Sequence, residues 1–411
     1  MSRKSPKPSR LAENSDQNSG PNNGTAGIYG HPDLTAVVEI VKNKFYLATL
    51  LPGTRNPESP TADTYLFETD TYLTYKNFYD DFGPLNLACL YKYCREVNKV
   101  LANPRFKLIV HYTSSNAKLR ANAVYLAASY SVLYLDQSPS DVYKSMRGDV
   151  GVMLRPFQDA SIGISRYTID LLDCLNALKK SASLGFFDFE DFDVHDYEKY
   201  GKIRNGDLNW IVPRKFIAFL GPSTEPGTAL HYPEKYLNYF MKNDVATVLR
   251  LNKANYEAHR FTSAGILHYE MYFPDGSTPP MNVLREFLHV AESTRGTLAV
   301  HCKAGLGRTG TLIAAYMMKH YMFSAREAVA WLRICRPGSV IGAQQVWLES
   351  IQGDMWREGR QFRLKYHGDD NLILHHKRGI YSIAEKLDKK ARLDERRFER
   401  RCLLATRGST S

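Results

Sequence analysis

The sequence contains few cysteines and lacks the long apolar runs that membranes require. Its 6 cysteines are scattered over 411 residues, which is too sparse for a disulfide framework. No apolar run approaches the roughly 20 residues of a membrane-spanning helix, and residues 2–24 carry no apolar signal segment. These absences argue against a disulfide-rich secreted scaffold and a helical membrane protein. We expect free thiols and a location in the cytosol or nucleus.

Patterns of metal ligands are also lacking. Cys89 and Cys94 lie five residues apart in a helix-like apolar segment, and no His or Cys follows them at the spacing of a metal site. We therefore predict that both lie in the core. Cys335 allows two interpretations, a buried structural thiol or a redox partner of a nearby reactive cysteine.

The net charge of +11 suggests nucleic acid as a partner, but most of the basic excess lies in residues 1–30 and 354–411. Basic runs at chain ends are typical of solvated tails or helix faces. The charge therefore predicts no specific nucleic-acid partner. The helix-like stretch 386–401 alternates in charge, so it is either a solvated helix or a segment for partner binding or nuclear targeting.

The order of the apolar segments predicts an α/β protein with two domains. Strand-like and helix-like runs alternate from residue 34, and a second series begins at residue 209. The length is enough for two domains, each with its own core. The expected divisions are a disordered arm (1–30), an N-terminal domain (31–185), an acidic linker (186–207), a second domain (208–360) and a basic C-terminal tail (361–411).

One strand-loop-helix unit occurs twice. Residues 108–112 (LIVHY) lead through a polar loop to Arg120, and residues 298–302 (LAVHC) lead through a polar loop to Arg308. Tyr112 stands in the first copy where the second has Cys302. We therefore expect two similar domains, of which only the second can use a cysteine.

The second loop has the composition of an anion cradle. Residues 301–310 (HCKAGLGRTG) join an apolar strand to a helix, so backbone N–H groups and the helix dipole converge on one point. Such a site stabilises a cysteine as its thiolate. Cys302 is the predicted nucleophile, Arg308 the predicted phosphate ligand, and Thr309 a predicted hydrogen-bond donor to the sulfur. The loop positions predicted to bind substrate are Lys303, Ala304, Gly305, Leu306 and Gly307.

A thiolate that displaces an alkoxide needs an acid to protonate the leaving group. Asp275, in the turn FPDGS after a predicted strand, is the candidate. A turn residue of this kind also occurs for conformational reasons alone. After the phosphoryl group has moved to the cysteine, a water molecule must be positioned to remove it. Gln344 or Gln345 could do this, and we favour Gln344.

These residues resemble the signature HCxxGxxR[ST] of the cysteine-dependent protein phosphatases. Together with RICRPGSVIG, NWIVP, FPDGSTP and DFDVHDYEKY, they identify the chain as similar to the CDC-fourteen-type dual-specificity phosphatases over residues 35–360. The resemblance implies two tandem dual-specificity-phosphatase-like domains, each a central mixed sheet flanked by helices. It also implies the roles given above for Cys302, Arg308 and Asp275, with no metal and no cofactor.

The resemblance implies a substrate as well. It suggests phosphoproteins with phosphoserine followed by proline, of the kind that cyclin-dependent kinases produce, and hence a role in cell-cycle control. In that family an acidic groove receives a basic residue beyond the proline. Glu198 and Asp207 match this groove, whereas Gly201 stands in place of an acid and Arg204 adds positive charge. The implied locations are nucleus and cytoplasm, including nucleolus, centrosome or spindle.

Three alternatives remain open from the residues. Lys303 also occurs in the phosphoinositide phosphatase signature CKAGKGR, although Leu306 replaces its second lysine. A non-catalytic phosphate-binding scaffold or an RNA 5′-triphosphatase could use the same cradle. The acidic stretch 188–198 is either a solvated linker or a groove for a basic partner. The oligomeric state cannot be predicted from the sequence.

Overall fold

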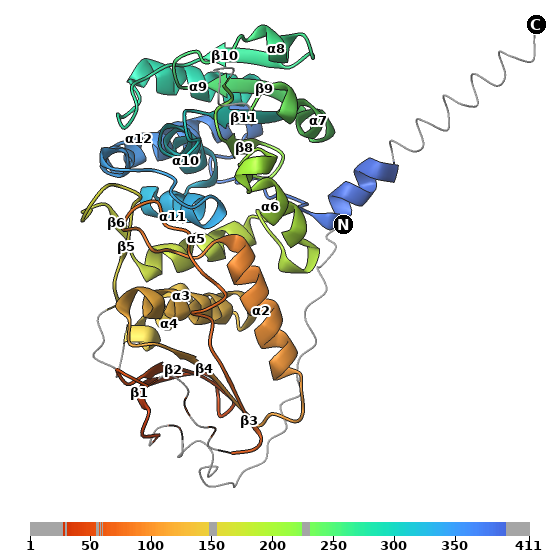
Figure 1. Cartoon of the computed structure of the whole chain (residues 1–411). Coiled ribbons are helices and arrows are strands. Elements are labelled where there is room, and N and C mark those ends of the chain that lie inside the picture. Colours follow the sequence, from red (N-terminus) through yellow and green to blue (C-terminus); the bar gives the residue numbers. More distant parts are fainter. Residues whose placement is uncertain are drawn as a thin grey trace, which may run out of the picture.

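The computed structural model describes residues 28, 31–54, 57, 59, 61–147, 154–223 and 231–391. Apart from Ile28, the predicted N-terminal arm lies outside these residues. The described part forms two α/β bodies, which Figure 1 shows one above the other. The predicted fold class is therefore confirmed. No helix in this described part is both long and apolar enough to span a bilayer.

The N-terminal body is built on a mixed sheet with strand order β1-β2-β4-β3. β1 is antiparallel to β2, and the other pairs are parallel. Helix α3 packs on this sheet and is buried from residue 121 to residue 132. The bounds are β1 Leu34–Val41, β2 Phe45–Leu50, β3 Thr64–Phe67, α2 Leu87–Leu101, β4 Leu108–Thr113, α3 Ala117–Tyr134, α4 Pro139–Arg147 and α5 Leu171–Ser183.

Short elements connect the two bodies. Strands β5 and β6 form a small antiparallel pair before α5. The acidic linker contains one short helix between two 3-10 turns, each of which starts after a polar or charged residue. The bounds are β5 Phe157–Gln158, β6 Thr168–Ile169, η1 Phe189–Asp191, α6 Val194–Tyr200 and η2 Ile203–Asn205.

The C-terminal body has a five-stranded sheet with strand order β10-β9-β11-β8-β7. Only β7 is antiparallel to its neighbour. The apolar run 209–219 forms β7 and β8 rather than one strand, because Pro213 interrupts it and Arg214 adopts a positive φ of 56°. The bounds are β7 Leu208–Val212, β8 Phe216–Phe219, α7 Glu234–Lys242, β9 Val245–Arg250, α8 His259–Thr262, β10 Leu267–Glu270, α9 Met281–Ser293, β11 Thr297–His301, α10 Gly307–Tyr321, α11 Ala325–Cys335 and α12 Ala343–His367.

The two bodies share one apolar core, and helices α5 and α11 pack together between the two sheets (Figure 1). The guanidinium of Arg326 donates to both carboxylate oxygens of Asp173, from Nη2 at 2.7 Å and from Nε at 3.0 Å and 3.1 Å. Lys180 binds Glu327 at 2.5 Å. Asp173 and Glu327 also close the capping boxes of their own helices. The same carboxylates therefore start each helix and join the domains.

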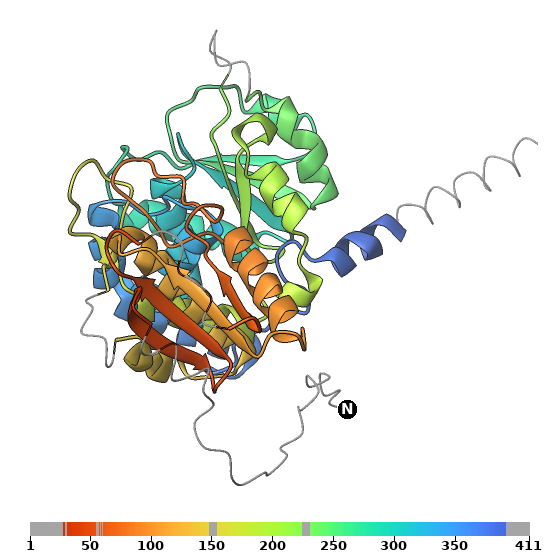
Figure 2. The ribbon, with the colours of Figure 1, turned by 60° about the horizontal axis from the view of Figure 1, so that its bottom comes forward.

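The C-terminal part of the chain does not leave the fold at the predicted boundary of residue 360, which falls inside α12. After α12 the chain returns to the acidic linker, seen beside α6 in Figures 1 and 2. Ile380 N donates to Phe186 O at 2.7 Å, and Asp193 N donates to Tyr381 O at 2.9 Å. The predicted tail is thus in contact with the fold as far as Lys389, which pairs with Asp244, and residues 392–411 lie outside the described part.

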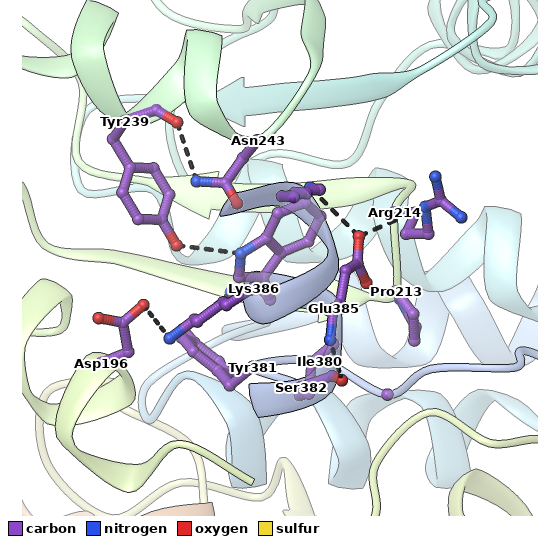
Figure 3. Close-up of a pocket in the computed structure, with 13 residues that line it drawn as sticks. Asp196, Pro213, Arg214, Tyr239, Asn243, Ile380, Tyr381, Ser382, Glu385 and Lys386 are labelled. Carbon is purple, nitrogen blue, oxygen red and sulfur yellow. Dashed lines mark hydrogen bonds and ion pairs between the residues drawn. The ribbon is translucent and has the colours of Figure 1, made fainter. Parts of the chain in front are cut away.

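Acidic side chains of the linker bind this returning segment. Ser382 Oγ and the Ala384 amide donate to Asp191, and Lys386 pairs with Asp193 at 2.8 Å and also with Asp196. Figure 3 shows Lys386 directed at Asp196. The returning segment of the chain itself is therefore the partner of these three acids, and it supplies the basic Lys386 to two of them, which neither interpretation of the acidic stretch anticipated.

Replacing Tyr381 by alanine should test how much the returning segment stabilises the fold. The ring is 4% exposed, packs against Phe192 and Tyr197, and its hydroxyl accepts from Trp210 N at 3.1 Å. Loss of a buried aromatic ring should lower the free energy of unfolding by about 3 kcal/mol. Urea denaturation measures this, with the exposed Lys390→Ala as control. Equal stability of the two variants would contradict the packing described.

Candidate active site

The predicted cradle lies at the carboxyl end of β11, the central strand of the second sheet. β11 is parallel to both neighbours, β8 and β9, so the loops after these three strands meet at one edge. Cys302 follows β11 directly and is 2% exposed. Helix α10 begins at Gly307, so residues 302–306 form the loop between strand and helix. The local structure is the predicted strand, loop and helix.

Two glycines allow this loop to pack closely. Gly305 has φ of +69°, and a Cβ there would lie 1.9 Å from the Phe219 carbonyl oxygen. A Cβ on Gly221 would lie 2.1 Å from the Cys302 carbonyl oxygen, and the Gly221 amide donates to Lys303 O at 3.1 Å. No other residue type fits either position without moving backbone. The end of β8 and the residues after it, Phe219 to Gly221, therefore fix the path of the loop.

Arg308 and Asp275 come together beside this loop. The Arg308 guanidinium is 3% exposed and lies with Nη2 3.1 Å from Asp275 Oδ1, while the Asp275 side chain is 64% exposed. Nη1 donates to the carbonyls of Leu251, at 3.3 Å, and Phe273, at 3.0 Å. Nε is buried without a hydrogen-bond partner in the described part of the chain. The site therefore holds a buried cation next to a carboxylate that faces solvent.

Thr309 lies in the first turn of α10, and Gln344, in the first turn of α12, packs beside it. Thr309 Oγ1 is buried and has no hydrogen-bond partner among the described residues. Gln344 is fully buried; its Nε2 donates to Ser277 O at 3.0 Å, and its Oε1 accepts from Ile341 N at 3.1 Å. A Cβ on Gly307 would lie 3.0 Å from Gln344 Oε1. Gln344 therefore connects the cradle to the loop that carries Asp275.

Gln345 lies in a different environment. Its Nε2 donates to Thr168 O on β6, at 2.9 Å, so the side chain faces the small antiparallel strand pair between the domains. Of the two glutamines left open by the sequence, only Gln344 contacts both loops of the candidate site.

His301, which precedes the cysteine, is held in a buried hydrogen-bond chain. Its Nδ1 lies 3.1 Å from the Cys302 carbonyl, which can only accept, so Nδ1 carries the proton. Tyr256 Oη donates to His301 Nε2 at 2.6 Å and lies 2.9 Å from His268 Nε2. Burial lowers the pKa of His301 to about 3 and that of His268 to about 4. Both imidazoles are therefore neutral at pH 7, and His301 orients the loop rather than supplying charge.

Arg336 is a site residue that sequence reasoning missed. It is 2% exposed, and it donates from Nε to Gly305 O at 2.8 Å and from Nη2 to Ala304 O at 2.9 Å. Its Nη1 also lies 2.9 Å from Asp207 Oδ1. Arg336 thus binds two carbonyls of the cradle from outside. In the sequence it is only an arginine before Pro-Gly, and nothing in its spacing links it to the loop.

Replacing Arg336 by methionine should impair both catalysis and stability. Two cradle carbonyls would lose their donor, and misplacement of the loop should lower kcat at least roughly tenfold. The unpaired Asp207 should lower the free energy of unfolding by about 3 kcal/mol. Phosphatase kinetics and urea denaturation measure the two effects, with the exposed Arg360→Met as control. Arg336→Lys should also lose activity, because an ammonium cannot bind both carbonyls and the carboxylate. An unchanged kcat would show that Arg336 does not position the loop.

The predicted substrate-binding acids line a groove between the domains, which we name the junction groove. It has a volume of about 380 Å³ and contains Glu198, Gly201 and Asp207, with Leu306 of the cradle at one side. Each acid already has a basic partner in the chain. Glu198 pairs with Lys92 at 2.5 Å, and Asp207 pairs with Arg336. Lys303 and Ala304 are exposed on the cradle, and Leu306 is half-buried.

The N-terminal body contains a similar loop with different occupants. Tyr112 lies on β4 at the position of the cysteine, next to a buried His111. The Asp70 carboxylate accepts from Thr113 Oγ1, at 3.1 Å, and from the Ser114 amide, at 2.9 Å. A carboxylate of the chain thus occupies donors of the first loop. Across the described part of both bodies, no three His, Cys, Asp or Glu side chains gather as metal ligands would.

Comparison with protein families identifies the class to which the two bodies and the cradle belong, the dual-specificity phosphatases. Residues 39–181 match the family described as "Dual specificity protein phosphatase, N-terminal half". Residues 236–349 match "Dual specificity phosphatase, catalytic domain". The tandem arrangement inferred from the repeated strand-loop-helix unit is therefore also found by comparison.

Named relatives identify the family within this class. The chain is 50% identical to human dual specificity protein phosphatase CDC14A over 339 residues, 81% of this chain and 56% of the relative. It is 47% identical to human CDC14C over 317 residues, 75% of this chain and 70% of the relative. The CDC14 homolog of Schizosaccharomyces pombe is 38% identical over 342 residues, 79% of this chain and 62% of the relative. The chain belongs to the CDC14 family of dual-specificity phosphatases. It spans a little over half the length of human CDC14A.

Proposed function

We propose that this chain is a protein phosphatase that hydrolyses phosphoserine and phosphothreonine through a phosphocysteine intermediate. The observation that carries the proposal is the approach of Arg308 Nη2 to Asp275 Oδ1, at 3.1 Å, beside the loop that begins with Cys302. The proposed nucleophile (Cys302), anion ligand (Arg308) and acid (Asp275) all lie in loops or helix starts at the same edge of the second sheet. The names of the CDC14 relatives as dual specificity or tyrosine-protein phosphatases support the same activity.

In the first step, the Cys302 thiolate attacks phosphorus and the bond from phosphorus to the serine oxygen breaks. Asp275 donates its proton to the leaving oxygen, so no free alkoxide forms. The amides of residues 303–307 and the guanidinium of Arg308 bind the three other oxygens and stabilise the charge of the transition state. The products are the free serine hydroxyl and a phosphocysteine.

In the second step, water attacks phosphorus and the sulfur–phosphorus bond breaks. Asp275, now a carboxylate, accepts a proton from this water, and inorganic phosphate leaves. We assign the orientation of this water to Gln344, and the support is that its side chain links the cradle to the loop of Asp275. Thr309 Oγ1 has a free donor in the described structure and would stabilise the departing thiolate.

The preferred substrate we propose is phosphoserine followed by proline, in proteins of the cell division cycle, in nucleus and cytoplasm. The motifs shared with the CDC14 family support this preference. Initial rates on matched peptides test it, with phosphoserine-proline compared with phosphoserine-alanine, phosphothreonine-proline and phosphotyrosine. We expect kcat/KM at least about tenfold higher for phosphoserine-proline than for phosphoserine-alanine, a difference of about 1.4 kcal/mol. Equal values would refute the proline preference and leave the hydrolytic chemistry in place.

Phosphoinositide hydrolysis is the second candidate. Lys303 favours it, because this exposed cation of the cradle has no acidic partner among the described residues. Leu306 opposes it, since it supplies no second cation for an additional phosphate. A soluble phosphoinositide in the same assay distinguishes the two candidates. We expect its kcat/KM to lie well below that of the phosphoserine-proline peptide.

A further inference from the structure

The junction groove is continuous with the cradle. Leu306 belongs to the cradle and also lines the groove. Arg336 lines the groove as well, and from there it binds the cradle carbonyls of Ala304 and Gly305. A peptide whose phosphoserine sits in the cradle therefore has one of its flanks beside this groove. The volume of the groove, about 380 Å³, is large enough to hold a side chain of that flank.

The charged side chains of the groove are mostly basic. Four are basic and two are acidic, which gives a net charge of +2; they are Lys76, Lys92, Lys202 and Arg336, and Glu198 and Asp207. Both acids are paired, with Lys92 and with Arg336. Lys76 and Lys202 have no acidic partner within the described ranges of the chain. The charge left for a ligand is therefore positive.

Gly201 lines the groove at a position where an acidic side chain would add a further negative charge. Its backbone has φ of −71°, a conformation that any residue adopts. A Cβ there would lie 3.1 Å from the Tyr197 carbonyl oxygen, so a side chain needs only a small adjustment. The backbone does not require glycine at this position. The absence of the acid is thus a change of charge in the groove rather than a demand of the fold.

We propose that the junction groove binds an anionic group of the substrate, a carboxylate or a second phosphoryl group close to the phosphoserine. This inference rests on the proposed function and replaces the basic residue that the family resemblance implies. An anion gains attraction from Lys76 and Lys202, whereas a lysine would meet two unpaired ammonium groups. The partly exposed ion pair of Lys92 and Glu198 is weak enough for an incoming anion to share Lys92.

A peptide series tests the groove directly. Phosphoserine-proline peptides carry lysine, alanine, glutamate or a non-hydrolysable phosphonate at one position from the second to the fifth residue after phosphoserine, and kcat/KM is measured for each. We expect glutamate or phosphonate at one position to exceed alanine by about three- to tenfold, and lysine to fall below alanine. If only the phosphonate is favoured, the ligand is a second phosphoryl group; if both are, a carboxylate suffices.

Variants assign the preference to the groove. In Lys76→Ala/Lys202→Ala the ratio of glutamate to alanine peptide should fall to about one, and in Lys202→Glu the lysine peptide should be preferred. Lys42→Ala, an exposed lysine of the turn between β1 and β2, should keep the wild-type ratio. A higher kcat/KM for the lysine peptide than for the alanine peptide in the unchanged protein would overturn the inference. An unchanged ratio of glutamate to alanine peptide in Lys76→Ala/Lys202→Ala would overturn it as well.

The failure of the inference can be separated from failure of the proposed function. Turnover of all peptides without an effect of charge refutes only the anionic groove. If no peptide is turned over, the affinities of the same peptides for Cys302→Ser, measured by fluorescence anisotropy, still test the groove. The glutamate or phosphonate peptide must then bind about three- to tenfold more tightly than the alanine peptide. Equal affinities would refute the groove independently of catalysis.

Discussion

Replacing Cys302 by serine is expected to lower kcat on phosphoserine-proline peptides by at least about 10⁴-fold, because the hydroxyl cannot replace the thiolate as nucleophile. The residue is 2% exposed at the base of the cradle, and serine differs from it by one atom. The cradle amides, Arg308 and Arg336 remain in place. Peptide affinity should therefore persist while turnover is lost, which initial rates and binding measurements show separately.

The matched control for this variant is Cys335→Ser. Cys335 is also a buried free cysteine of the second body, at the end of α11. Its replacement should lower stability, since a hydroxyl enters an apolar site, but the folded protein should keep its kcat. A Cys302→Ser variant with more than a small fraction of wild-type turnover would refute the nucleophile. Loss of activity in both variants would point to unfolding.

Replacing Asp275 by asparagine is expected to lower kcat for phosphoserine peptides by about 10²- to 10⁴-fold, the usual contribution of a general acid. Asparagine keeps the shape of the side chain but cannot supply the proton. The loss should be much smaller for an aryl phosphate, because a phenolate leaves without protonation far more easily than an alkoxide. The dependence on leaving group distinguishes an acid from a residue that only holds Arg308.

The structure makes this distinction necessary. Asp275 lies 3.1 Å from Arg308 Nη2, so its removal also changes the surroundings of the guanidinium. If the two substrates lose activity equally, Asp275 acts through Arg308 and does not protonate the leaving group. Asp354→Asn is the control, because Asp354 is an exposed carboxylate paired with an arginine on α12. Its kcat should equal that of the unchanged protein on both substrates.

The parts of the site that the sequence predicts are those within short stretches of chain. The cradle and the start of α10 occupy ten consecutive residues, and strand, glycine-containing loop and helix are each specified locally. The repeated unit predicted the second α/β body for the same reason. Asp275 was found because chemistry demanded an acid and a turn offered one. Asp275 lies close to Arg308 because the strands before their loops, β10 and β11, are parallel in one sheet, so that their carboxyl ends lie at the same edge.

The parts that could not be predicted depend on contacts between distant segments. Arg336 reaches the cradle because α11 returns beside β7, and the sequence gives no periodic signal for this contact. The anchoring of residues 380–386 on the linker joins charges almost 200 positions apart, as in Lys386 with Asp193. Local composition predicted a solvated tail and could not identify its partner. The charge of the junction groove likewise depends on Lys76, from the other domain.

Detection of the covalent intermediate tests the central claim most directly. A phosphoserine-proline peptide in excess is mixed with the protein, the reaction is quenched in the millisecond range, and the peptide that contains Cys302 is examined by mass spectrometry. The account predicts one added phosphoryl group on the Cys302 sulfur, more of it in a Gln344→Ala variant with slower hydrolysis, and none in Cys302→Ser. Rapid peptide hydrolysis without phosphorylation of Cys302 at any time would contradict the account.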